Sequence, residues 1–185
     1  MRAAIQKLSA PQKSSFIYQV KSSKQFRFNW HFHPEYELTL ICRGHGKRFV
    51  ADSIDDFTEG ELVLLGPNLP HTWQSEANGS ERHKAIVIQF SWSFLGNEFF
   101  ETSELRHAKG LLERCSHGLS FSGKARSTAV KHIQNMGNLS GVQRLTSLLE
   151  ILDILARSRK AEVISSPGFV PSLHRTNHRR IDRVC

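Results

Sequence analysis

The sequence contains no apolar run close to the ~20 residues that a membrane-spanning helix needs. The segment from Met1 to Tyr18 also lacks the continuous apolar stretch of a secretory signal. Only three cysteines occur, and they are odd in number, widely spaced and without a CxxC pair: Cys42, Cys115 and Cys185. This usage favours reduced thiols over a disulfide framework and argues against a zinc ribbon. These absences predict a cytoplasmic protein that does not contact a membrane.

Acidic residues are few relative to basic ones, with 17 Asp and Glu against 25 Lys and Arg, which gives a net charge of +8. Residues 157–185 hold seven Lys or Arg and two acids, so this end alone carries +5. Such a segment is typical either of an end that faces nucleic acid or of a solvated linker. The charge alone leaves both interpretations open.

Short apolar segments separated by glycine and proline fill residues 15–100. In residues 25–30 three aromatic residues alternate with polar ones, which predicts a half-buried strand. We predict further strands over 15–21, 36–42, 47–51, 62–65 and 84–90, with 52–58 as a polar connection. Many short strands at this spacing indicate an antiparallel sandwich or barrel.

The periodicity becomes helical after residue 100. We predict helices over 104–115, 123–136 and 140–159, which together form a helical region over 101–159. In the third helix, Ile151 and Ile154 widen the leucine stripe beyond what one packing face needs. This width predicts a homodimer contact through 140–159, and a purely intramolecular helix is the alternative. The chain is therefore expected to be mainly β with C-terminal α, with a flexible arm at 1–14 and a linker at 160–185.

The polar residues with the clearest chemistry lie in the segment His31-Phe32-His33-Pro34-Glu35-Tyr36-Glu37. Residues two apart in a strand point the same way, so His31 and His33 share a face, and Glu37 has the same parity. His71 follows a stiff proline-rich loop on another strand and is expected to meet them. Three imidazoles and a carboxylate suit a divalent metal, which would be Zn, Ni, Fe or Mn. A polar cluster without metal is the alternative.

Two motifs resemble those of the cupin family. His31-x-His33-x3-Glu37-x6-Gly44 is similar to the first cupin motif, and Gly60-x6-Pro67-x3-His71 is loosely similar to the second. Two positions depart from the pattern, because Gln25 stands where a glycine is usual and Ser75 where an asparagine is expected. The resemblance implies a double-stranded β-helix barrel followed by about three helices.

The whole chain resembles the N-terminal sensor and dimerisation domain of AraC-type transcription regulators, on the runs 31–44 and 60–73. This resemblance implies a small polar effector, such as a sugar, in the barrel, and an arm at 1–14 that closes over it. Residues 180–185 are similar to the opening of the first DNA-binding helix of these regulators. We therefore expect contact with DNA only through a C-terminal region that this sequence lacks, and no sequence-specific DNA binding without it.

The resemblance also implies the residues of the effector site. The expected ligand-binding residues are His31, His33, Glu35, Tyr36, Glu37, His71 and Trp73, and the metal ligands, if a metal is held, are His31, His33, Glu37 and His71. Strand parity places Trp30 on the opposite face. The remaining histidines are expected on the surface: His45, His83, His107, His117, His132, His174 and His178. A metal-dependent cupin enzyme, a dioxygenase or isomerase, is the alternative function, although the helices and basic end favour a regulator over an enzyme.

Overall fold

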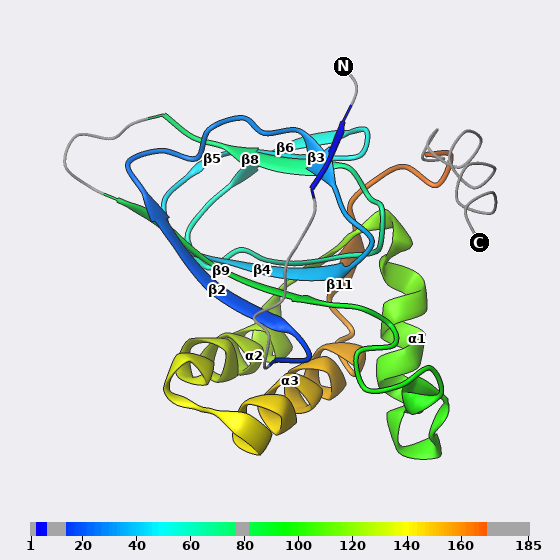
Figure 1. Cartoon of the computed structure of the whole chain (residues 1–185). Helices are drawn as coiled ribbons and strands as arrows, with labels where there is room; N and C mark the ends of the chain where they lie inside the picture. The colour runs from blue at the N-terminus through cyan, green and yellow to red at the C-terminus, as the bar shows by residue number, and fades with distance from the viewer. Residues whose placement is uncertain (1–2, 7–13, 77–81, 170–185) are drawn as a thin grey trace, which may run out of the picture.

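The computed structural model describes residues 3–6, 14–76 and 82–169. Two β-sheets face each other, and three α-helices cover the outer side of one of them (Figure 1). The five-stranded sheet has the order β1 (Ala4–Ile5), β3 (His31–Phe32), β8 (His71–Gln74), β5 (Gly46–Val50), β6 (Ser53–Phe57). The six-stranded sheet has the order β11 (Ala161–Val163), β10 (Leu119–Phe121), β7 (Leu62–Leu65), β4 (Tyr36–Arg43), β9 (His83–Phe90), β2 (Ile17–Ser23). This is the predicted double-stranded β-helix arrangement.

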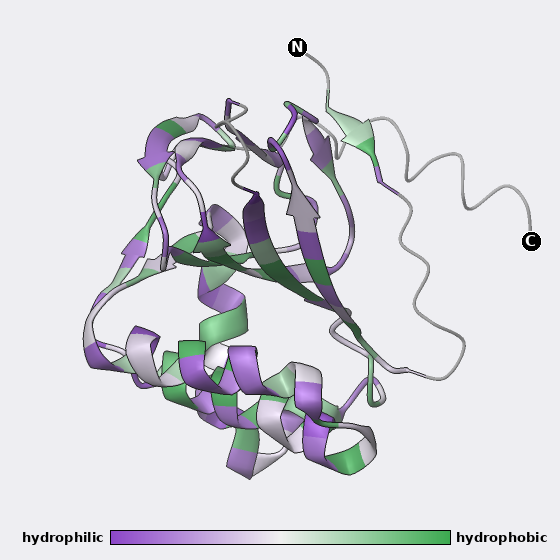
Figure 2. Ribbon diagram, turned by 90° about the vertical axis from the view of Figure 1, so that its left-hand side faces the viewer, coloured by the Kyte–Doolittle hydropathy of each residue, from purple (hydrophilic) through white to green (hydrophobic). Residues whose placement is uncertain are grey.

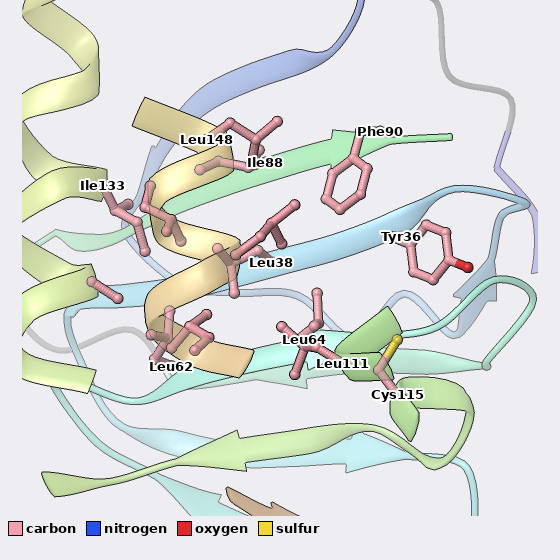
Figure 3. Packing of buried hydrophobic residues seen from close by; sticks show 14 of the residues in the cluster. Tyr36, Leu38, Leu62, Leu64, Ile88, Phe90, Leu111, Cys115, Ile133 and Leu148 are labelled. Atoms are coloured by element: carbon pink, nitrogen blue, oxygen red, sulfur yellow. The ribbon is translucent and has the colours of Figure 1, made fainter. Parts of the chain in front are cut away.

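The six-stranded sheet is buried on both faces, and strand β4 shows why. Residues 36–41 of this strand are all buried although their side chains alternate between the two faces. Leu38 points to the helices, together with Leu62 and Leu64 of β7 (Figure 3). Leu40 belongs to the same core cluster. Glu37, Thr39 and Ile41 point to the facing sheet, so one strand supplies both an apolar core and a polar barrel interior.

The three helices lie close to the predicted positions. They are α1 (Arg106–Arg114), α2 (Gly123–Asn135) and α3 (Gly141–Ala156), and short 3₁₀ turns flank them at Phe99–Glu101, Ser103–Leu105, Cys115–His117 and Met136–Asn138. Hydrophobic and hydrophilic residues alternate along each helical ribbon, which is the pattern of amphipathic helices (Figure 2). Leu111, Ile133 and Leu148 bring one residue of each helix into the core against the sheet (Figure 3). Within the described residues, no helix is long and apolar enough to cross a membrane.

The strand predicted at 25–30 is wrong. This segment runs beside β8 without a ladder, because hydroxyl groups of β8 and the residue after it take the backbone amide protons. The amide of Phe26 donates to Ser75 Oγ (2.8 Å), and the amide of Asn29 donates to Thr72 Oγ1 (3.0 Å). The polar connection predicted at 52–58 is also wrong, since Ser53–Phe57 forms the edge strand β6.

The two ends of the chain add strands that were not predicted. Within the expected arm, β1 pairs in parallel with β3, while residues 1–2 and 7–13 lie outside the described part. Within the expected linker, β11 pairs with β10 and extends the six-stranded sheet. The linker from residue 170 onward, with the expected opening of a DNA-binding helix at 180–185, lies outside the described residues.

Candidate functional site

Three histidine rings meet inside the barrel. His31 of β3 and His71 of β8 are directly opposite each other in the sheet, and their ring centroids lie 4.4 Å apart. The His33 ring follows at 5.1 Å from His71 and 5.9 Å from His31. One ring nitrogen from each histidine lies within 4.8 Å of the others. The three histidine rings that the sequence spacing predicted to lie together therefore do so in the structure.

The proline-rich loop before β8 is fixed at both ends. The amide of Gly66 donates to the Cys115 carbonyl (2.8 Å), and a Cβ at Gly66 would lie 2.7 Å from that same oxygen. The amide of Asn68 donates to the carbonyl of His33 (2.8 Å). The loop that delivers His71 is thus tied to the backbone that carries His33, which holds the two rings in one place.

The backbone also sets which nitrogen of each ring faces the centre. Nδ1 of His31 lies 2.7 Å from the Asn29 carbonyl, and Nδ1 of His71 lies 2.8 Å from the Leu69 carbonyl. Nδ1 of His33 lies 3.1 Å from the carbonyl of Glu35. A carbonyl accepts a hydrogen bond and cannot donate one, so Nδ1 of each ring carries a proton and Nε2 is the nitrogen that faces the centre.

Glu37 supplies a carboxylate to the same centre. Its Oε2 lies 3.1 Å from His33 Nε2, and its Oε1 lies 3.6 Å from His71 Nε2. Burial by itself raises the pKa of the Glu37 carboxyl, but the facing His71 and His33 rings outweigh burial and hold the pKa well below its usual range. Burial, and then the neighbouring His71, lowers the pKa of His31 to about 4. At neutral pH Glu37 is therefore ionised and His31 is uncharged.

The donor set fits a divalent cation. Nε2 of His31 and Nε2 of His71 are buried and have no hydrogen-bond partner among the described residues. Buried acceptors without a donor are costly, and a cation bound by their lone pairs removes that cost. Imidazole nitrogen and carboxylate oxygen are preferred ligands of Zn, Ni, Fe and Mn, and the Nδ1 hydrogen bonds to carbonyls are the outer contacts usual for metal-bound histidine.

A cavity of about 530 Å³ opens beside this cluster between the two sheets. His31, Glu37 and Thr39 contribute polar atoms to its wall. Its apolar wall includes four side chains, Phe26, Ile41, Trp73 and Val87. Lys21 and Arg27 line the same cavity. A small molecule with several hydroxyl, amide or acid groups matches such a mixed lining.

Comparison with known proteins identifies the family of this chain. A family model described as the AraC-like ligand binding domain matches residues 14–133. The chain belongs to this family. No match was found among curated protein sequences. The AraC-like domain is also similar in fold to an apo ToxT structure from Vibrio cholerae, with 15% identity and a TM-score of 0.50 over 76% of this chain and 54% of ToxT.

Two further solved structures are similar to part of the chain. The transcriptional activator CuxR is 14% identical, with a TM-score of 0.43 over 67% of this chain and 41% of CuxR. Bacillus subtilis oxalate decarboxylase is 22% identical, with a TM-score of 0.36 over 43% of this chain and 22% of the enzyme. The AraC-like domain thus spans about half the length of ToxT and less of CuxR.

Trp73 lines the cavity of the AraC-like domain as predicted, and two buried charges hold it there. Its indole Nε1 donates to Glu61 Oε2 (3.1 Å), and Arg48 donates to the other oxygen of Glu61 (2.5 Å). Burial raises the pKa of Glu61 and outweighs the attraction of Arg48. This ion pair joins strand β5 to the turn before β7, and it places the tryptophan ring against the cavity.

Tyr36, a predicted ligand-binding residue, points away from the cavity. It lies on the helix-facing side of β4, where its ring stacks on Phe90 at 5.4 Å (Figure 3). Burial raises the pKa of its hydroxyl to about 12. Because Tyr36 and Glu37 are neighbours in one strand, their side chains cannot both face the cavity. The prediction for Tyr36 is therefore wrong.

The other predicted residues divide into those that line the cavity and those behind it. His31 and Glu37 line it, whereas His33 and His71 lie behind them. Glu35 does not line it either, since its Oε2 lies 3.5 Å from His33 Nδ1, on the side of the ring that faces away from the cluster. Glu35 is therefore a supporting neighbour of His33.

Sequence reasoning missed Gln89 and misplaced His83. Gln89 lies opposite Glu37 across β4 and β9, and its amide donates to Glu37 Oε2 (2.6 Å). The signal was present, because a lone glutamine with the parity of Ala85 and Val87 interrupts an otherwise apolar strand. His83 was expected on the surface but is buried, with Nε2 donating to the Glu76 carbonyl (3.0 Å).

Proposed function

We propose that this AraC-like domain senses a small polar metabolite, such as a sugar, for a transcription regulator. The observation that carries the proposal is the cavity of about 530 Å³ with an ionised, buried Glu37 and the His31 ring in its wall. Burying such groups is costly unless something pairs with them, and a polar ligand that donates hydrogen bonds to them does so. The family assignment supports ligand binding and leaves the ligand open.

A direct contact route connects this site to the segment that follows the helices. The Leu69 carbonyl accepts from His71 Nδ1, and the Leu69 side chain is buried in a cluster on which Ile164 and Phe169 pack. Ser166 is tied to the turn between β5 and β6, because its amide donates to Asp52 Oδ1 (3.0 Å). A ligand that shifts the His71 loop therefore acts directly on the segment 164–169. A sensor needs such an output to a following segment.

The proposal is tested with a panel of sugars, polyols, amino acids and organic acids, using the thermal unfolding midpoint of the protein as the readout. At least one class of compound is expected to raise the midpoint by several degrees, since a ligand at 100 times its Kd adds about 2.7 kcal/mol. The same compounds are then assayed for consumption, with and without Fe²⁺ or Mn²⁺. Stabilisation without turnover supports a sensor, and turnover supports the cupin dioxygenase or isomerase instead.

We further propose that the three histidines and Glu37 hold a divalent metal. The support is the pair of buried Nε2 atoms, on His31 and His71, that have no partner in the described part of the chain. When bound, such an ion supplies a positively charged point of attachment for an oxygen atom of the effector. Metal content measured on protein purified without a His-tag tests this, and a value below about 0.1 metal per chain would contradict tight binding.

We also propose that α3 contributes to a homodimer. Val142 is 74% exposed, and Leu145 and Leu149 are only partly buried. These residues follow each other at helical spacing and form a partly exposed apolar row, in which Leu145 also packs against the core.

A further inference from the structure

The centre of the histidine cluster is partly filled by one neutral side chain. The Nε2 amide group of Gln89 lies 2.6 Å from Glu37 Oε2 and 3.3 Å from His33 Nε2. An amide NH₂ has two hydrogens, so it can donate to both atoms at once. Gln89 is itself buried, and it faces Glu37 directly across the two strands. Its position is thus set by the ladder as well as by the two acceptors.

These two atoms, Glu37 Oε2 and His33 Nε2, are among the proposed ligands of the metal. With the Nδ1 proton of His33 directed to the Glu35 carbonyl, Nε2 is the nitrogen that a metal would use, and it lies 3.1 Å from the Glu37 carboxylate. The Gln89 amide group lies beside both atoms and donates to Glu37 Oε2. The amide nitrogen has no lone pair free for a metal, so a cation and this amide group compete for the same atoms.

We propose that Gln89 is a built-in competitor of the metal: its amide hydrogens occupy Glu37 and His33, and a divalent cation binds only after Gln89 turns away. This inference rests on the metal site proposed above. The movement would carry the amide toward the cavity, whose wall includes Glu37, Thr39 and Val87, the inner-face neighbours of Gln89. Gln89 thereby lowers the affinity of the site, and removing its amide strengthens metal binding although a polar residue of the site is lost.

The test is a calorimetric titration of Zn²⁺, against a competing chelator at near-neutral pH, into the whole 185-residue chain without a His-tag. Gln89→Leu keeps the size of the side chain and removes both donors. We expect it to bind Zn²⁺ about tenfold more tightly than wild type, the effect of one hydrogen bond to a charged group. His33→Ala is expected to bind at least about tenfold more weakly, as a lost ligand should.

Thr39→Val is the matched control. Thr39 Oγ1 donates to the other oxygen of the same carboxylate, Glu37 Oε1 (2.8 Å), and makes no contact with His33. Its Kd is expected to stay within about threefold of wild type, since surviving partners still orient Glu37. An equal gain in Thr39→Val and Gln89→Leu would show that any lost donor to Glu37 has this effect, and it would overturn the specific role of Gln89.

The remaining outcomes separate this inference from the metal proposal. Zn²⁺ binding that is unchanged or weaker in Gln89→Leu leaves the metal site standing and overturns the competition. Absence of Zn²⁺ binding in wild type and in Gln89→Leu contradicts both, without touching the ligand-binding family. If Gln89→Leu does not fold, the side-chain amide resonances of Gln89 in wild type decide: they shift on Zn²⁺ addition if the amide is displaced, and unchanged resonances overturn the inference.

Discussion

Arg48 provides the sharpest test of how the cavity wall is supported. Its side chain is only 7% exposed and pairs with Glu61, which is 10% exposed and also holds Trp73. Arg48→Met keeps the length of the side chain and leaves the Glu61 carboxylate without its cation. Breaking a buried pair on one side costs about 3–5 kcal/mol, so we expect Arg48→Met to lose about 3 kcal/mol of unfolding free energy at pH 7.

The unfolding free energy lost in Arg48→Met is expected to depend on pH, and the protonation of Glu61 determines whether the loss grows or shrinks. Burial already raises the pKa of Glu61 in the wild-type fold, and removal of Arg48 raises it further. A carboxyl whose folded-state pKa lies above its unfolded value favours folding most when protonated, and this contribution is lost as pH rises through the folded pKa. Arg48→Met should therefore be closer to wild type at about pH 5 than at pH 7.

Urea denaturation at both pH values measures these differences. Lys47→Met is the control, since the neighbouring Lys47–Asp56 pair (2.7 Å) is 55% and 75% exposed and should contribute under about 1 kcal/mol. Arg48→Met/Glu61→Leu removes both buried charges and should recover most of the loss. A double variant no more stable than Arg48→Met, or a loss that is equal at both pH values, would refute the view that the cost is a stranded buried carboxylate.

Three other predictions concern the rest of the domain. In α3, Val142→Glu is expected to weaken a dimer at least about tenfold in sedimentation experiments, while Gln143→Glu at the neighbouring exposed position does not. A wild-type protein that is monomeric at high concentration would contradict the dimer. Burial raises the pKa of Cys115 to about 12 and also raises the pKa of half-buried Cys42. Peptide mapping after brief alkylation should therefore find Cys42 modified before Cys115, which should react only after unfolding. Early labelling of Cys115 would show that it is not in the core. Asp52→Ala removes both carboxylate oxygens that accept hydrogen bonds from Ser166. The rate of amide hydrogen exchange in residues 164–169 should then rise, while the rate in α3 is unchanged. Unaltered exchange in 164–169 would show that this contact does not hold the segment.

The helices and strands could be predicted where the spacing of apolar residues in the sequence matches the side of the element that is buried. The three helices and the strands around Leu38, Leu64 and Ile88 follow directly from their apolar patterns. The pattern failed at 25–30, where alternation is present but the hydroxyls of Thr72 and Ser75 replace the ladder. It failed again at Ala161–Val163, since a strand this short and exposed is defined by its pairing with β10 alone.

The site was predictable to the extent that it lies within a few residues of one strand. His31, His33 and Glu37 share a parity, and the motif spacing added His71. Parity also excludes Tyr36, and applying it there as it was applied to Trp30 would have avoided that error. The contribution of Gln89 depends on the register between β4 and β9, which spacing along one strand does not reveal.

The dissociation constant of a cavity ligand for wild type and for His31→Ala is the most direct test of the central claim. His31 lines the cavity and belongs to the histidine cluster, so it joins the two parts of the proposed sensor site. For a compound that stabilises the wild-type protein, we expect His31→Ala to weaken binding at least about tenfold, the loss of one hydrogen bond or ligand contact in a buried site. Equal dissociation constants for the two proteins, with both folded, would contradict the claim that this cluster forms part of the sensor pocket.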